Sequence, residues 1–91
     1  MRTIYKYTLS LDKEQTIELP ANAQILTVQA QREFPQLWAM IDTDEERTEQ
    51  ITIIFHGTGN PIENEACSSY IGTIQLYGGQ LVLHAFLKYK Q

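Results

Sequence analysis

The segment FHGTGNPI, residues 55–62, holds the densest group of residues that could do chemistry. It sets a histidine, a hydroxyl and an amide around two glycines that are one residue apart. Backbone N–H groups in such a loop can form a concave nest for an anion, and Thr58 and Asn60 add polar side chains. The same glycines also let a chain leave a strand and turn a corner, because glycine tolerates positive φ.

The spacing in this segment excludes a common phosphate loop. A P-loop needs Lys and then Ser or Thr after its glycines, and it opens a helix whose N-terminus faces the phosphate. Here Asn60 and Pro61 follow the second glycine, and no helical periodicity is present. We therefore predict that the segment is first a corner and second a ligand contact. The residues assigned to that contact are His56, Thr58, Gly59 and Asn60.

The other reactive side chains form no catalytic or metal-binding pattern. Cys67 has no basic neighbour in sequence that would favour its thiolate. The pair Ser68-Ser69 lacks the GxSxG elbow of a hydrolase. Two histidines, His56 and His84, and one cysteine give no cluster with metal-ligand spacing. We predict no catalytic residue, no metal and no cofactor, and hence a protein that is not an enzyme.

Length and charge bound the class of protein. The chain of 91 residues predicts a single domain, residues 1–91, and 43% hydrophobic residues is an ordinary globular composition. A net charge of −4 argues against binding to DNA or RNA, which depends on basic surface. The apolar runs are too short for a membrane span, and MRTIYKYTLS lacks the pattern of a signal peptide. One cysteine allows no disulfide within the chain. These features favour a soluble cytoplasmic protein with no membrane partner.

The hydrophobic pattern has period two almost throughout, which is typical of half-buried strands. The predicted strands are residues 3–11, 16–19, 25–34, 37–42, 51–56, 70–77 and 80–89. About seven short, mostly antiparallel strands without a helix predict an all-β domain, a small sandwich or a barrel-like meander.

Particular stretches predict how these strands are joined. Pro35-Gln36 is predicted to be a tight turn, and Gly78-Gly79 a two-residue hairpin turn at positive φ. Residues 43–50 contain no apolar side chain and are predicted to be a solvated loop. Residues 37–42, LWAMID, are apolar on both faces, which predicts a central strand covered on both sides.

Two further residues complete the predicted ligand site. Trp38 is assigned as a ring that can stack on a base, and Arg32 as a cation that can balance a phosphate. The polar row Thr27, Gln29 and Gln31 is assigned to solvent, unless a ligand or a second protomer covers it.

The blocks TIYKY, LPANAQILTVQAQ, LWAMID, GTGNPI and YIGTIQLYGGQLVLHAF resemble a family of short phage and prophage proteins of uncharacterised function. The resemblance covers nearly the whole chain. It implies a small β protein made in the cytoplasm of a bacterial host, and it transfers no catalytic residue. The family pattern tends to have histidine where this chain has Asn60.

The class and size of this family lead to two functional hypotheses. The first is a non-enzymatic counter-defence protein that sequesters a nucleotide-type immune signal of the host. The alternative is a protein-interaction module that inhibits a host protein by direct contact. In either case we expect a homo-oligomer, because so small a β domain has more apolar surface than one core needs.

Overall fold

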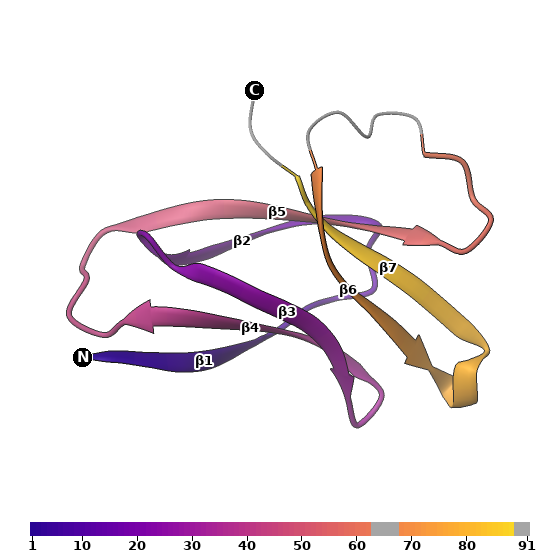
Figure 1. Ribbon diagram of the computed structural model, residues 1–91, viewed down its shortest axis with the longest axis horizontal. Helices are drawn as coiled ribbons and strands as arrows, with labels where there is room; N and C mark the ends of the chain where they lie inside the picture. The colour runs from indigo at the N-terminus through magenta and orange to yellow at the C-terminus, as the bar shows by residue number, and fades with distance from the viewer. Residues whose placement is uncertain (63–67, 89–91) are drawn as a thin grey trace.

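The computed structural model describes residues 1–62 and 68–88. These ranges contain seven strands and one short 3-10 turn (Figure 1). The elements are β1 (Arg2–Thr8), β2 (Glu14–Pro20), β3 (Gln24–Gln31), β4 (Phe34–Asp42), β5 (Thr48–Gly57), β6 (Ser68–Leu76), η2 (Tyr77–Gly79) and β7 (Leu81–Lys88). The prediction of an all-β domain is confirmed. The described residues include no helix that is long and apolar enough to span a membrane.

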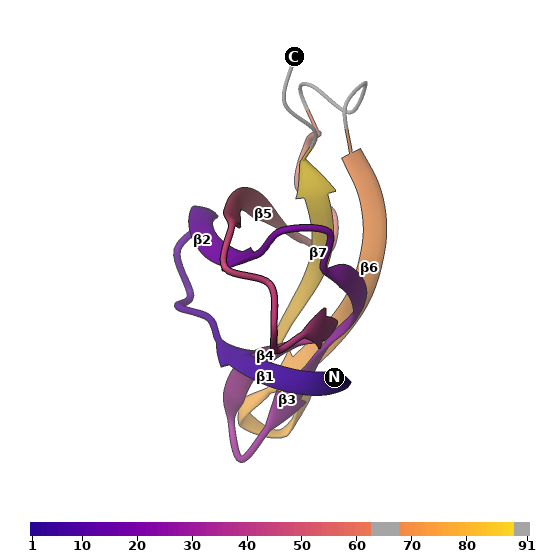
Figure 2. The same ribbon diagram turned by 90° about the vertical axis from the view of Figure 1, so that its left-hand side faces the viewer.

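The strands form two antiparallel sheets that face each other and do not close into a barrel. Sheet A has the strand order β1-β4-β3, and sheet B has the order β2-β5-β7-β6. Figure 2 shows the two layers nearly edge-on, with β6 passing close to β3. The molecule is therefore a sandwich whose two sheets come together at the edge strands β3 and β6.

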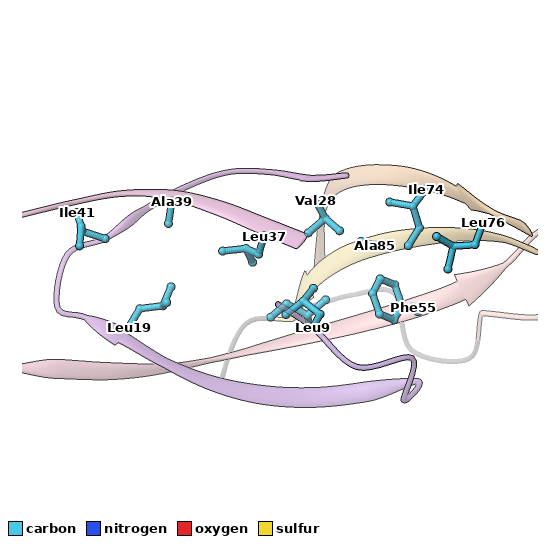
Figure 3. Packing of buried hydrophobic residues seen from close by; sticks show 11 residues of the cluster. Leu9, Leu19, Val28, Leu37, Ala39, Ile41, Phe55, Ile74, Leu76 and Ala85 are labelled. Carbon is cyan, nitrogen blue, oxygen red and sulfur yellow. The ribbon is translucent and has the colours of Figure 1, made fainter. Parts of the chain in front are cut away.

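The core lies between the sheets. On β4 the alternate residues Leu37, Ala39 and Ile41 are buried, and Leu19 of β2 and Phe55 of β5 lie on the opposite side of the core (Figure 3). This is the period-two alternation of the sequence: each strand turns one set of side chains inward. Burial of these apolar side chains is the main favourable term in folding.

One close backbone contact joins β3 to β6, and we call it the β3–β6 seam. A Cβ atom added at Gly72 would lie 2.2 Å from the Val28 carbonyl oxygen, so no side chain fits there. Beside it the Thr27 hydroxyl donates to the Ile71 carbonyl oxygen (3.2 Å). Both strands carry a register shift at this level, one beside Thr27 and one beside Gly72. The two sheets thus meet through a glycine and a hydroxyl rather than through a regular ladder.

The prediction of a turn at Pro35-Gln36 is wrong. The chain turns at Arg32 and Glu33, which both have positive φ (52° and 67°), and Gln31 pairs with Phe34. Pro35 lies inside β4, where it has no N–H to donate; its carbonyl oxygen accepts from the Leu9 N–H (2.9 Å). Glycine is normally preferred in such a two-residue turn, so its absence hid the turn from the sequence.

The hairpin between β6 and β7 also differs from the prediction in length. Leu76 pairs with Leu81, so the connection has four residues, from Tyr77 to Gln80, instead of two. The positive φ expected of the glycines is confirmed, at 67° for Gly78 and 90° for Gly79. Tyr77 also has positive φ (53°), and its N–H donates to the Glu33 carboxylate of the neighbouring hairpin.

Two further predictions are only half right. Residues 37–42 do form a central strand, but among the described residues no layer covers the outer side, where Trp38 and Met40 stay half-buried. The acidic stretch 43–50 is not a loop throughout, because β5 already begins at Thr48.

The seam gives a stability prediction. Gly72→Ala should lower the free energy of unfolding by about 1–3 kcal/mol, because the new methyl group meets backbone that cannot rotate away. Gly59→Ala is the control: Gly59 also has positive φ (84°), but the space around its Cβ position is empty. Urea denaturation measures both. A loss for Gly72→Ala no larger than for Gly59→Ala would show that the seam tolerates a side chain.

Candidate functional site

The GTGN segment forms a tight corner at the end of β5. The Asn60 N–H donates to the Gly57 carbonyl oxygen (3.1 Å), which closes a four-residue turn. Gly59 has φ 84°, the value that the third residue of a type II turn requires. The corner predicted from the two glycines is therefore present.

Asn60 is part of the turn as well as a polar group on its surface. A Cβ atom added at Gly57 would lie 2.6 Å from Asn60 Nδ2, so the amide packs over the glycine. A side chain at Gly57 would push this amide aside, and the exposed Asn60 side chain can rotate to allow it. The Asn60 amide thus lies close to the end of β5.

Thr58 extends from this turn to a row of polar side chains on sheet B. Its Oγ1 lies 2.7 Å from His84 Nε2 on β7, and His84 Nδ1 lies 3.0 Å from Thr73 Oγ1 on β6. Thr73 Oγ1 is in turn 2.6 Å from the Tyr70 hydroxyl. We call these four side chains the polar row. Since a hydroxyl can donate or accept, a neutral His84 ring can satisfy both of its nitrogens here.

His56 lies directly opposite His84 in the ladder between β5 and β7 but has a different environment. It is only 9% exposed, and its ring packs edge-on against Phe86 (centroids 5.5 Å apart). Its Nδ1 is buried and has no hydrogen-bond partner within residues 1–62 and 68–88. Such an unpaired buried group costs about 1–3 kcal/mol of stability.

A cavity of about 230 Å³ opens beside His56, and we call it the end cavity. Its polar lining comes from Lys13, His56 and Asn60, and its apolar lining includes Phe55 and Leu83. The Phe55 N–H donates to the Lys13 carbonyl oxygen (2.7 Å), which holds the β1–β2 connection against β5. Pockets for whole drug-sized ligands have about 300–1,000 Å³. The end cavity therefore fits one ring or one phosphate-sized group, with the rest of a ligand outside.

The predicted site residues separate into two groups. His56 and Asn60 both line the end cavity, and Thr58 and Gly59 belong to the turn beside it. Trp38 lies on β4, on the outer side of sheet A, and Arg32 lies in the exposed turn between β3 and β4. Neither of these two lines the end cavity.

Sequence reasoning missed the residues that reach the turn from other strands. Thr73 and His84 lie on the same face of sheet B because they pair directly. Alternation within each strand was visible, but the pairing of β6 with β7 and of β7 with β5 was needed to bring both to Thr58. Lys13, on the β1–β2 connection, was not among the predicted site residues. Cys67, considered as a nucleophile, lies outside the described residues.

Metal chemistry finds no support in the part of the chain that the structure describes. No group of three or more His, Cys, Asp or Glu side chains gathers there in a way that could hold an ion.

The fold and the site define a small antiparallel β-sandwich with a polar turn and a cavity at one end of sheet B. Sandwiches of this kind host many unrelated functions on their loops, so the class alone sets no activity. The chain belongs to the family described as a domain of unknown function, DUF7352, which matches residues 1–91. No curated protein and no solved structure matches the chain.

The two histidines should respond oppositely to replacement by leucine, which has a similar volume. His84→Leu should lower the free energy of unfolding by about 1 kcal/mol, because it removes two hydrogen bonds to hydroxyls. His56→Leu should leave stability unchanged or raise it, because it removes a buried nitrogen without a partner. Urea denaturation of both variants gives the comparison. Equal losses would show that His56 Nδ1 is paired in the folded protein.

Proposed function

We propose that the protein is a non-enzymatic binding protein that sequesters a small anionic ligand of the nucleotide type at the end of sheet B. The observation that carries this proposal is His56, buried beside the end cavity with a ring nitrogen that has no hydrogen-bond partner among the described residues. A buried group of this kind is usually paired; because the nitrogen has almost no exposed surface, a ligand in the cavity would reach it only once the ring turns toward the opening.

The lining of the end cavity supports the class of ligand. The Asn60 amide can donate to a phosphate or to the edge of a base, and Lys13 brings a cation to a chain of net charge −4. Phe55 and Leu83 supply apolar wall for a ring. Thr58 is exposed beside the end cavity, and its hydroxyl can contact the part of the ligand that stays outside.

Binding without turnover accounts for the polar row better than catalysis does. Thr58 and His84 have the spacing of a nucleophile and a base, which is the pattern that would favour an enzyme. A catalytic dyad is normally oriented by a third group that stabilises the charged histidine, whereas Thr73 is neutral. The row therefore serves to position the turn.

The biological setting that we propose is counter-defence. In it the protein is encoded by a phage and acts in the cytoplasm of a bacterial host, where it withdraws a nucleotide signal of host immunity. This setting rests on the resemblance to short phage proteins, and the chemistry of the end cavity supplies only the class of ligand.

Titration calorimetry against a panel of mononucleotides and cyclic nucleotides tests the proposal. The double variant Thr58→Ala/Asn60→Ala should bind about five- to a hundred-fold more weakly, the loss expected for one or two hydrogen bonds. Thr16→Ala is the matched control, because Thr16 also shares a side-chain hydrogen bond with a threonine on sheet B, Thr52 (2.9 Å).

Two outcomes would contradict the proposal. One is equal affinity for the double variant and the parent, which would leave the turn as a corner only. The other is recovery of a chemically changed nucleotide after denaturing the complex, which would make the protein an enzyme.

A second surface supports self-association, and the other partner that we propose is a second copy of this chain. The outer face of sheet A carries Ile4, which is 52% exposed, next to the half-buried Trp38 and Met40. Lys6 lies opposite Trp38 in the strand register on this face. No carboxylate lies among Ile4, Lys6, Trp38 and Met40. Two copies of an acidic chain can therefore meet here without repulsion between acids.

We expect a homo-oligomer by light scattering at micromolar concentration. Ile4→Glu should convert it to a monomer, because the variant buries a carboxylate in an apolar contact. Leu11→Glu is the control, since Leu11 is also exposed (45%) but lies on the β1–β2 connection. A monomeric parent would contradict self-association and leave this face to another protein, as the host-inhibitor alternative requires.

A further inference from the structure

A groove of about 680 Å³ lies along the β3–β6 seam, away from the end cavity. It is lined by residues 25–30 of β3 and 70–73 of β6. Figure 1 shows these two strands running beside each other in the same direction. Its volume falls within the range of about 300–1,000 Å³ found for ligand pockets.

The walls of this groove are uncharged. None of its ten lining residues is Asp, Glu, Lys or Arg, although 20% of the chain is charged. A charged ligand would lose its hydration here and gain no opposite charge in return. The groove therefore selects for an uncharged ligand.

Tyr70 presents a fixed aromatic ring to the groove. The side chain is 59% exposed, yet its hydroxyl is 2.6 Å from Thr73 Oγ1 and its ring packs edge-on against Phe86 (5.7 Å). Since two contacts already hold the ring, little conformational entropy is lost when a ligand stacks on it. An exposed, preorganised ring suits the apolar face of a cyclic ligand.

Gln29 supplies the free polar group of the groove. Its side chain is exposed and makes no hydrogen bond to any residue that the structure describes. The amide offers two N–H donors and one acceptor oxygen, which match hydroxyl groups on a ligand. The neighbouring Thr27 hydroxyl already donates a hydrogen bond to the Ile71 carbonyl oxygen.

The backbone argues against an extended peptide as the occupant. Both edge strands have a bulge at this level, beside Thr27 in β3 and beside Gly72 in β6. Bulges on edge strands interrupt the regular ladder to which another strand would add. At the seam, moreover, the two backbones already touch at Gly72 and Val28.

We propose that the β3–β6 groove binds an uncharged, hydroxyl-rich ring, which is the chemistry of a sugar. Tyr70 stacks on its apolar face, and the Gln29 amide binds its hydroxyls. The same chemistry is present in a free saccharide and in the ribose of a nucleoside. The groove is a separate site from the end cavity, which neither Tyr70 nor Gln29 lines, although the Tyr70 hydroxyl contacts the polar row through Thr73.

Ligand-observed NMR with the full chain tests the groove, using maltose, lactose and trehalose in one arm and adenosine in the other. We expect binding in at least one arm. Tyr70→Ala should weaken it about five- to a hundred-fold, as loss of an aromatic stacking contact does. Tyr77→Ala is the matched control, because Tyr77 is almost equally exposed (53%) and lies outside the groove.

Two more variants keep the test decisive if Tyr70→Ala does not fold. Tyr70→Phe keeps the ring and should retain most of the affinity, whereas Gln29→Ala should weaken binding about five- to tenfold. Binding of a saccharide identifies the free sugar as the ligand, and binding of adenosine alone identifies the nucleoside. Absence of binding in both arms, or an equal loss for Tyr77→Ala and Tyr70→Ala, would overturn the proposal.

Discussion

The approach of Gly72 to the backbone of Val28 determines where the two sheets meet. Because a Cβ atom at Gly72 would lie 2.2 Å from the Val28 carbonyl oxygen, β6 can lie this close to β3 only with glycine at that position. The Thr27 hydroxyl fastens one end of the seam, and at the hairpin tips the Glu33 carboxylate accepts from the Tyr77 N–H. The sandwich is thus closed on this side without a ladder, and the groove is what remains between the strands.

The same seam places the polar row. Thr73 follows Gly72 directly, and its hydroxyl contacts Nδ1 of His84. His84 then reaches Thr58 through Nε2, across the full width from β6 to the turn after β5. The position of the GTGN turn therefore depends on three strands of sheet B as well as on its own glycines. A substitution at the seam should therefore shift the position of the turn, because each pair of neighbours in the polar row is in direct side-chain contact.

The strands were predictable because each turns one face to the core, so period two appears in the sequence of each. The Gly57–Asn60 corner was predicted from its glycines, while the turn at Arg32 and Glu33 was missed because neither is glycine. The site was predictable as far as it is local. His56 and Asn60 are close in sequence, whereas the contact of Thr58 with His84 spans 26 positions and depends on strand pairing.

The buried ring nitrogen of His56 lowers the stability of the fold, which makes the end cavity the first place to search for a ligand. A domain of 91 residues buries only about 60% of its chain surface and has a net stability of about 5–15 kcal/mol. An unpaired buried nitrogen removes about 1–3 kcal/mol of that small margin. A leucine would fill the same volume without this cost, and the neighbouring His84 shows that sheet B can pair a histidine fully. The proposed ligand therefore rests on a ring nitrogen that has no partner among the described residues, in a histidine at the wall of a cavity that an amide and a lysine also line.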